Sequence, residues 1–367
     1  MHRLMAGVTI LEHELSELRL LVERQTGILL DCPNSALAAH VAEYLESHEL
    51  ESPAALLGWL RSAELDPAEL ALFLDGVLNV NTGFFRHPGA MNALTRQVIP
   101  QLYTRKSGDG SSTLRIWSAG CGSGEEAYSI AMALCEPQPA ANGASANGNG
   151  RDKDKENVKE KDTKARSGGI CDAPPPVPAA GPALKDWSIH IIGSDLLPSA
   201  IEMAERGVYP QSALTGLPPA MIRACFSKIG NSTVAAAAPP DPTMNGAARA
   251  ASPAAAPNSA PNNGNGAHLL VKPRLRSLVT FNTMNLTKPV YIGRFDCIFC
   301  MDVLPHLSRA QRVALLERLH LYLEPGGYLF LSQTEKLAAP NLNFRPETYD
   351  GYTYHRKPMA ASAAYGR

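Results

Sequence analysis

The first part of the chain carries apolar residues at the spacing of short helices, as in the series Leu15, Leu18, Leu21 and Val22. Further along, Asp66 precedes Pro67. This pair predicts the start of a helix over Ala68–Leu74, because Asp accepts hydrogen bonds from the exposed N–H groups of a first turn and Pro fits its backbone angle. The sequence therefore predicts a small all-α domain at residues 1–78.

After residue 114, short apolar runs alternate with helical segments. The expected strands are Leu114–Trp117, Ile189–Ile192, Phe295–Cys300 and Tyr328–Leu331. The expected helices are one from Glu125, Pro198–Arg206 and Ser308–Leu323, the last followed by a turn at Glu324–Gly327. This alternation is typical of a doubly wound, Rossmann-like α/β sheet. We assign it to residues 114–357, with residues 79–113 as a linker helix and residues 358–367 as a flexible tail.

Two segments, about 136–186 and 230–267, differ from the rest in composition. The first is rich in Ala, Asn, Gly, Pro and charged residues, and the second in Ala, Pro and Asn. Neither has apolar periodicity or enough large hydrophobic residues to offset the entropy cost of ordering. We predict two disordered insertions at the surface.

Charge and cysteine content narrow the class of protein. Lys and Arg number 34 against 35 Asp and Glu, a formal net charge of −1, so the balance indicates neither nucleic acid nor an anionic membrane. No apolar run reaches the roughly 18 residues of a membrane helix, and Met1–Leu4 does not open a signal peptide, so we expect a cytoplasmic protein. Cys297 and Cys300 fall on opposite faces of an expected strand, which favours buried thiols, and we predict no metal site.

A glycine-rich turn follows the first expected strand. Gly120-Cys121-Gly122-Ser123-Gly124 would let the backbone approach a nucleotide-like ligand, although a tight turn without a ligand has the same pattern. Such sites place an acid about 20 residues later to bind ribose hydroxyls. Asp195 lies 71 residues after Gly124, but the low-complexity segment Glu136–Trp187 contributes 52 of these and leaves 19. Asp195 alone would also fit a helix cap.

Three motifs add specificity to this pattern: Asn79–Arg86 with the sequence NVNTGFFR, Trp117–Ala131 with WSAGCGSGEEAYSIA, and Phe295–Leu304 with FDCIFCMDVL. Together they resemble the CheR family, the bacterial chemotaxis receptor methyltransferases that methylate glutamate side chains. The resemblance implies S-adenosylmethionine as cofactor, and a chemoreceptor or related signalling protein as methyl acceptor. A nicotinamide-dependent oxidoreductase would explain the glycine turn and Asp195 but neither flanking motif.

The resemblance also implies a set of cofactor-binding positions: Thr82, Arg86, Gly120, Gly122, Glu126, Asp195, Asn285, Leu286, Asp302 and Val303. Glu126 in a first helical turn could meet the cofactor's amino group, or act only as a cap. The Asn285 amide could form hydrogen bonds with the edge of the adenine, or Asn285 could be only a turn residue. Arg86 is our first candidate catalytic residue, because it could orient a carboxylate of the acceptor or cofactor, or it could form a structural salt bridge.

A carboxylate acceptor is already ionised at neutral pH, so this chemistry needs no general base. The chain departs from the family pattern C-R-N-V-L-I-Y-F at Met301, Asp302, Pro305 and His306. Asp302 could still accept a hydrogen bond from the adenine amino group. His306, at the position of the tyrosine, is our second candidate catalytic residue, as a polar wall or base, although it also reads as a partly exposed histidine. These changes predict altered or reduced carboxyl methylation, or a non-catalytic scaffolding module.

Two further segments bear on the partner. In the family a basic helix faces the receptor, whereas here the corresponding stretch carries Glu43, Glu46 and Glu49, which would repel an anionic receptor or simply form a solvated face. Residues 207–226 resemble the start of the family's small inserted β subdomain, which docks a receptor tail in some members. The second insertion interrupts this subdomain, so the sequence does not predict tail docking.

Overall fold

A computed structural model describes residues 10–62, 66–78, 82–108, 110–135, 187–229, 267–289, 292–337, 339 and 341–359. The two predicted insertions lie outside the described residues apart from Ala267, as does the predicted tail apart from residues 358 and 359. Asn79–Asn81, which open the first motif, lie outside them as well.

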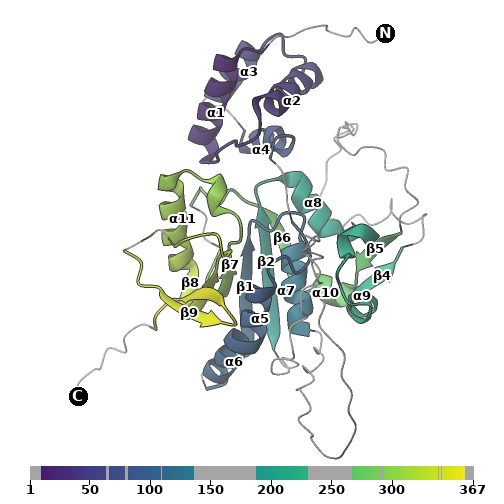
Figure 1. Ribbon diagram of the computed structural model, residues 1–367, viewed down its shortest axis with the longest axis vertical. Coiled ribbons are helices and arrows are strands. Elements are labelled where there is room, and N and C mark those ends of the chain that lie inside the picture. The colour runs from purple at the N-terminus through teal and green to yellow at the C-terminus, as the bar shows by residue number, and fades with distance from the viewer. Residues whose placement is uncertain are drawn as a thin grey trace, which may run out of the picture.

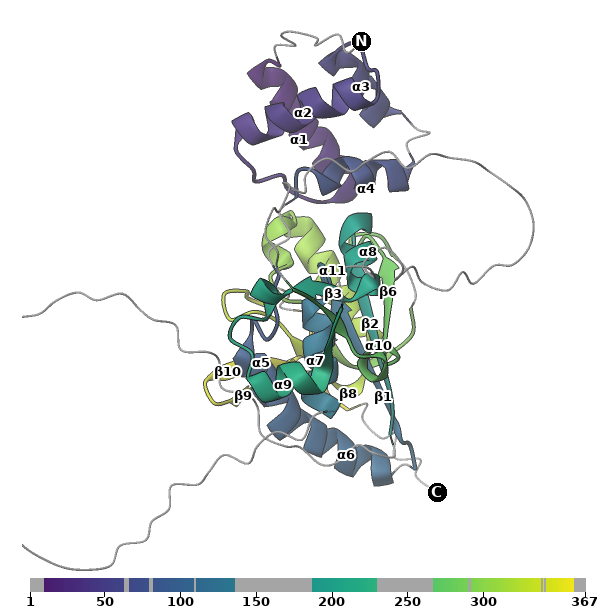
Figure 2. The ribbon, with the colours of Figure 1, turned by 90° about the vertical axis from the view of Figure 1, so that its right-hand side faces the viewer.

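Four helices form a separate layer at the N-terminal end (Figures 1 and 2), namely α1 (Glu12–Thr26), α2 (Asn34–Ser47), α3 (Pro53–Arg61) and α4 (Pro67–Asp75). The leucines predicted at helical spacing are buried in one core shared by these helices. Asp66 caps α4, because its Oδ1 accepts a hydrogen bond from the Ala68 N–H at 2.9 Å. The predicted helix start at Asp66–Pro67 is confirmed.

The larger layer contains a seven-stranded sheet in the order β6-β2-β1-β7-β8-β10-β9. Its strands are β1 (Thr113–Ala119), β2 (Ser188–Asp195), β6 (Val279–Thr283), β7 (Phe295–Phe299), β8 (Leu323–Phe330), β9 (Arg345–Tyr349) and β10 (Tyr352–Arg356). The first five strands in this order pair in parallel, and β10 pairs antiparallel with both β8 and β9. The predicted doubly wound fold is confirmed, and its strand order reverses between β1 and β7, where such sheets bind ligands.

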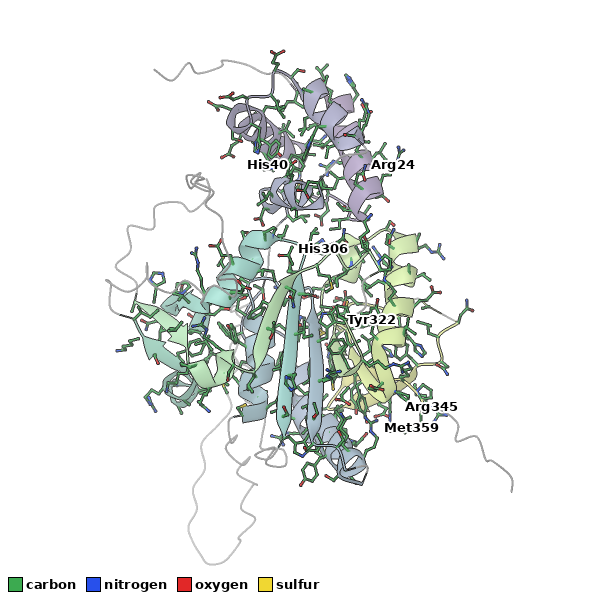
Figure 3. The ribbon with its side chains drawn as sticks, turned by 180° about the vertical axis from the view of Figure 1, so that it is seen from behind. Arg24, His40, His306, Tyr322, Arg345 and Met359 are labelled. Atoms are coloured by element: carbon green, nitrogen blue, oxygen red, sulfur yellow. The ribbon has the colours of Figure 1, made fainter. Side chains whose placement is uncertain are left out.

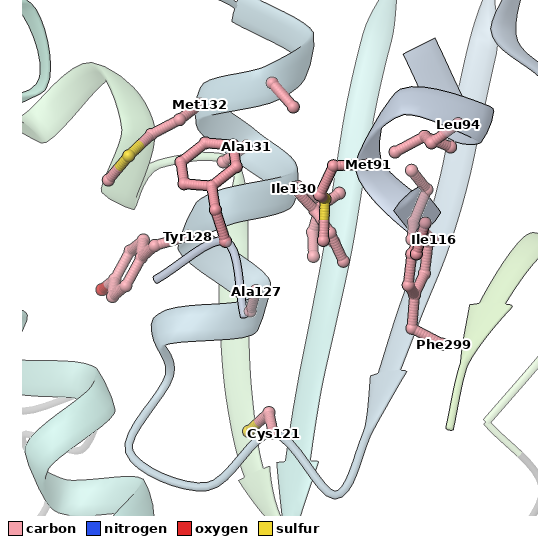
Figure 4. Close-up of a cluster of buried hydrophobic side chains, with 14 of the residues drawn as sticks. Met91, Leu94, Ile116, Cys121, Ala127, Tyr128, Ile130, Ala131, Met132 and Phe299 are labelled. Atoms are coloured by element: carbon pink, nitrogen blue, oxygen red, sulfur yellow. The ribbon is translucent and has the colours of Figure 1, made fainter. Parts of the chain in front are cut away.

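Helices cover both faces of this sheet. One face packs against α5 (Pro88–Ala93), a π-helical turn (Leu94–Val98), α6 (Ile99–Gly108) and α7 (Glu125–Cys135). Figure 4 shows part of this core, with Met91 of α5 and Ile130 of α7 over the strands that carry Ile116 and Phe299. The other face packs against α11 (Arg309–Tyr322). Cys297 belongs to the first core and Cys300 to the second, so both thiols are buried as predicted.

The predicted turn at Glu324–Gly327 is wrong in one respect, because β8 runs through it. Phe295 of β7 pairs with Leu323, and Cys297 pairs with Tyr328. The interval of two residues from Phe295 to Cys297 in β7 is therefore paired with an interval of five residues from Leu323 to Tyr328 in β8, and the extra residues of β8 form a bulge. Gly326 has a φ of 74°, a left-handed conformation that glycine adopts without strain.

A small antiparallel sheet follows α8 (Pro198–Arg206), in the order β3-β5-β4. It consists of β3 (Val208–Pro210), β4 (Phe226–Lys228) and β5 (His268–Val271), with the short helices α9 (Pro219–Cys225) and α10 (Pro273–Arg276). The predicted inserted β subdomain is confirmed. Its Tyr209 and Phe226 pack edge-on against Phe84, so the subdomain helps to hold the T-x-F-F-R segment in place.

The helical layer is joined to the sheet layer along two seams. At the first, the Thr26 carbonyl accepts from the Thr287 hydroxyl at 2.6 Å, and Ile28 forms a β-bridge with Leu307. At the second, Asp75 at the end of α4 accepts from the hydroxyl of Ser199 in α8 at 2.6 Å. The helices are therefore fixed over the carboxyl ends of the parallel strands.

Among the described residues, no helix has the length and apolar character needed to cross a membrane. The described part of the chain also contains no group of three or more His, Cys, Asp or Glu side chains placed to hold a metal ion.

A buried ion cluster closes the opposite end of the sheet. Asp296 of β7 is 1% exposed, and its Oδ2 accepts from Lys106 Nζ at 2.8 Å and from the Arg115 N–H at 3.0 Å. Arg105 Nη2 lies 3.6 Å from the other carboxylate oxygen. Because Arg105 and Lys106 belong to α6, Asp296 ties this helix to the centre of the sheet.

We predict that Asp296→Ala lowers the free energy of unfolding by about 3 kcal/mol, because it leaves two partly buried cations without their carboxylate. Urea denaturation measures this loss. The exposed Glu205 of α8 provides the control, since Glu205→Ala should change the same quantity by no more than about 0.5 kcal/mol. A loss below about 1 kcal/mol for Asp296→Ala would show that the cluster is not a significant source of stability.

Candidate functional site

A cavity of about 550 Å³ lies between the helical layer and the carboxyl ends of β1, β2 and β7. Its wall includes Ile28, Pro33 and Leu78 from the helical layer and the segments that follow the three strands. His306 stands at this boundary in Figure 3, between the N-terminal helices and the sheet. The cavity therefore occupies the place where the strand order reverses, which is the usual ligand position of this fold.

The residues predicted for cofactor binding and catalysis all line this one cavity. They are Thr82, Arg86, Gly120, Gly122, Glu126, Asp195, Asn285, Leu286, Asp302, Val303 and His306. The fold brings them together from segments that lie far apart along the chain. Their individual roles stay predictions.

The glycine turn is fastened to the end of β2. The Ser194 carbonyl accepts from the N–H groups of Gly120 at 2.7 Å and Cys121 at 2.9 Å. Gly120 has a φ of 83°, and a Cβ there would lie 2.4 Å from Cγ2 of Val303. Glycine is required at this position both by its backbone conformation and by the approach of the segment after β7.

Asp195 joins the turn to the start of α8. Its Oδ2 accepts from the Gly122 N–H at 2.8 Å and its Oδ1 accepts from the Leu197 N–H at 3.1 Å. Burial raises the pKa of this carboxyl, and the backbone N–H groups oppose that rise. Asp195 thus lies in the turn before α8 and also lines the cavity, and its ribose role stays a prediction.

The two glutamates that open α7 have different environments. Glu125 accepts a hydrogen bond from the Ser123 hydroxyl at 2.8 Å and is also hydrogen-bonded to Thr82. Unlike Thr82, Glu125 does not line the cavity. Glu126 faces the cavity, and its Oε1 accepts from the Ser118 hydroxyl at 2.6 Å.

The pKa of Glu126 is raised to about 7, chiefly because burial removes water from its carboxylate. The Ser118 hydrogen bond opposes this rise, whereas the charges of Asp302 and Glu335 add to it. Near neutral pH this carboxyl therefore titrates, and a nearby cation would favour its ionised form.

The T-x-F-F-R segment turns sharply so that Arg86 reaches the cavity. Phe85 is buried with a φ of 51°, and its N–H donates to the Ser129 hydroxyl at 2.9 Å. A left-handed conformation at a bulky residue is costly, and it is held here by burial of the Phe85 side chain and by the hydrogen bond to Ser129. The two phenylalanines thus anchor the turn that presents Arg86 and His87.

Asp302 faces this turn from the end of β7. Its Oδ2 lies 3.3 Å from Arg86 Nε and 3.0 Å from His87 Nε2. The salt bridge weighed for Arg86 on sequence grounds is therefore present, within the cavity lining.

Two further residues at the site, His87 and Glu335, belong to no pattern that the sequence offers. The Glu335 carboxylate accepts from the N–H groups of Asp302 at 3.1 Å, Leu304 at 2.8 Å and Ser332 at 2.9 Å. It fixes the backbone after β7, yet it follows Asp302 by 33 residues, beyond α11, and no spacing rule connects the two.

Asn285 and His306 are involved in joining the two layers. Asn285 Oδ1 accepts from the Thr287 N–H at 2.9 Å, and its Nδ2 donates to the Thr26 carbonyl at 3.4 Å. The predicted turn role is thus present, beside the cavity. The His306 side chain is exposed, and its carbonyl accepts from the Leu29 N–H at 2.8 Å.

The family model described as CheR methyltransferase, SAM binding domain, matches residues 80–168 and 255–352, about half of the chain. The chain belongs to the CheR family. It therefore belongs to the S-adenosylmethionine-dependent methyltransferases, and the predicted family and cofactor are confirmed.

Curated relatives extend the similarity over most of the chain. Chemotaxis protein methyltransferase 1 of Pseudomonas aeruginosa is 26% identical over 322 residues, covering 87% of this chain and 88% of that protein. Chemotaxis protein methyltransferase of Vibrio parahaemolyticus is 24% identical over 336 residues, covering 91% and 92%. Among solved structures, magnesium protoporphyrin IX methyltransferase of Synechocystis with bound SAM is 13% identical, covers 80% of this chain and 97% of that chain, and has a TM-score of 0.27.

We predict that Gly120→Ala weakens binding of S-adenosylhomocysteine by at least about tenfold, because the new Cβ must displace Val303 from the cavity wall. Isothermal titration calorimetry measures this affinity. Gly216→Ala is the matched control, since Gly216 also has a positive φ, 96°, but nothing lies within 4 Å of the place that an alanine methyl would occupy there. The control should bind as the wild type does.

The double variant Gly120→Ala/Val303→Ala tests the cause, because Cβ of Val303 would lie 3.8 Å away and relieve the overlap. Partial recovery of affinity is expected. Wild-type affinity in the single variant would refute the steric account.

Proposed function

We propose that this methyltransferase transfers the methyl group of S-adenosylmethionine to glutamate carboxylates of a chemoreceptor or a related signalling protein. The observation that carries the proposal is the presence of the Arg86 guanidinium in a cavity wall formed by the family motifs. A planar guanidinium suits a carboxylate, which it can bind with two parallel hydrogen bonds. The curated relatives are named chemotaxis protein methyltransferases, which favours the same substrate class.

The cavity residues fit the cofactor. The glycine turn leaves no side chain between backbone and ligand at Gly120 and Gly122, and we assign Asp195 to the ribose hydroxyls. Glu126 is the partner for the amino group, since its carboxylate is buried and becomes ionised more readily beside a cation. We assign the adenine to the part of the cavity wall that contains Asn285 and the apolar Leu286 and Val303, with Thr82 as a further cofactor contact.

For this methyl transfer the protein mainly has to orient the acceptor carboxylate and the cofactor. When bound, S-adenosylmethionine supplies an electrophilic methyl group on a sulfonium. A glutamate carboxylate has an ordinary pKa of about 4.3 and is ionised at neutral pH, so no residue has to remove a proton from it. Arg86 orients the carboxylate, and the helical layer over the cavity limits access of water to the site. His306 at the rim forms part of the polar wall.

A second candidate function is a non-catalytic module that binds the cofactor in a signalling complex. The Asp302 contact with Arg86 favours it, because this carboxylate competes for the guanidinium that we assign to orientation. In addition, Met301 stands where the family pattern has an arginine, and it is buried in the core with its sulfur 3.9 Å from the Tyr352 hydroxyl. The two candidates differ in whether methyl transfer occurs at all.

We expect the purified protein to transfer tritium-labelled methyl groups from S-adenosylmethionine to receptor-containing membranes, as label that alkali releases. Alkali releases methyl from carboxyl esters but not from methylated amines, so the assay identifies the acceptor group. Asp195→Ala is the control and should lose both cofactor affinity and labelling, because its hydrogen bonds to ribose are lost. Tight binding of the cofactor without transfer would reject the proposal in favour of the non-catalytic module.

We further expect the affinity for S-adenosylhomocysteine to rise as the pH increases from about 5.5 to 7.5. Glu126, whose pKa is about 7 in the free protein, must release its proton to pair with the ligand's amino group. Calorimetry in two buffers of different ionisation enthalpy should detect proton release near pH 6.5. Glu126→Gln should flatten the pH dependence, and an equally steep dependence in that variant would show that another group titrates.

A further inference from the structure

The contact between Asp302 and Arg86 joins two elements that carry separate family motifs. Asp302 follows β7, whereas Arg86 and His87 precede α5. The Asp302 Oδ2 lies within 3.3 Å of a nitrogen of each residue. All three side chains line the cavity, so this ion pair is formed at the place where a ligand would bind.

The geometry of Asp302 is fixed by its surroundings. Its φ of 57° is left-handed, a conformation that Asp and Asn tolerate better than most residues. Glu335 holds the backbone on both sides of it through the N–H groups of Asp302 and Leu304. The left-handed turn at Phe85 fixes the opposite partner. The carboxylate and the guanidinium are therefore brought together by two constrained backbones.

The charged and titratable groups around Asp302 come from three directions. Arg86 and His87 face it from the segment before α5, Glu126 from α7, and Glu335 from the segment after β8. Asp302 is thus a third carboxylate beside Glu126 and Glu335. It reduces the positive potential that Arg86 would otherwise offer to an anionic ligand.

We propose that Asp302 is a positioning residue that holds Arg86 in the cavity wall, so that a ligand carboxylate competes with Asp302 for Arg86. The inference rests on the proposed function in assigning Arg86 to a carboxylate. That carboxylate belongs either to the cofactor or to the acceptor glutamate. In both cases Asp302 lowers the affinity for the anion and keeps the guanidinium oriented when no ligand is bound.

Asp302→Asn is the appropriate variant, because Asn keeps the shape and tolerates the left-handed conformation while removing the charge. The first experiment compares S-adenosylhomocysteine with 5′-methylthioadenosine, which has the same adenosyl thioether but lacks the amino-acid part. The second measures binding of a glutamate-containing helical peptide, and of its glutamine counterpart, to the protein saturated with S-adenosylhomocysteine. Neither experiment requires methyl transfer.

Removing the competing charge should tighten binding of the relevant carboxylate about two- to fivefold, as expected for loss of a half-exposed ion pair. If the carboxylate is the cofactor's, S-adenosylhomocysteine binds more tightly and 5′-methylthioadenosine is unchanged. If it is the acceptor's, only the glutamate peptide binds more tightly. In either case the gain should vanish in an Arg86→Gln background, where Asp302 has no guanidinium to release.

Asp350→Asn is the matched control, since Asp350 also has a left-handed φ, 48°, in the exposed turn between β9 and β10. It should alter none of these affinities. An equal change for S-adenosylhomocysteine and 5′-methylthioadenosine would place Asp302 at the adenosine and overturn the proposal. Unchanged binding of all four ligands, or a gain that persists with Arg86→Gln, would overturn it as well. Failure of the membrane-labelling assay would reject the proposed function alone.

Discussion

The attachment of the glycine turn to the end of β2 is the constraint on which the site depends. The Ser194 carbonyl accepts two N–H groups of the turn, and the Asp195 carboxylate accepts a third from Gly122. These bonds join two strands that the chain separates by residues 120–187, and they place Asp195, the turn and Glu126 around one space.

The remaining walls are held by strained or specially shaped backbone. Phe85 and Asp302 have left-handed conformations, and Arg86, which follows Phe85, contacts Asp302. Burial of Phe85 and the hydrogen bonds of Glu335 offset the cost of these conformations. The glycine at 120 then allows Val303, next to Asp302, to approach the turn.

Most of the fold could be predicted because its signals are local. The strand and helix patterns, the Asp66 cap and the spacing of Asp195 after the first insertion all depend on residues near one another in the sequence or on one compositional change. The bulge at Gly326 was missed because only pairing with β7 shows that the strand continues through the expected turn.

The motifs indicated which residues line the cavity, but not which of them contact each other. Arg86 and Asp302 are 216 residues apart, and Glu335 follows a complete helix, so no periodicity relates them. Asn285 and His306 carried a second unforeseen role, since both are involved in the seam with the helical layer. Contacts of this kind are set by tertiary packing.

The cavity is lined by the carboxylates of Asp31, Glu126, Asp195 and Asp302, with Glu335 beside Asp302, and by the guanidinium of Arg86 and the imidazole of His87. A cationic ligand group lowers the repulsion among the carboxylates, whereas an anionic group has to compete for Arg86. Glu335 is occupied by three backbone N–H groups and cannot adjust its position without disturbing the turn after β7. When a cationic group binds, Glu126 can release its proton. When an anionic group binds Arg86, Asp302 loses its ion pair with that residue. Under the proposed function, a sulfonium cofactor that binds first therefore partly neutralises the site that a carboxylate acceptor must enter.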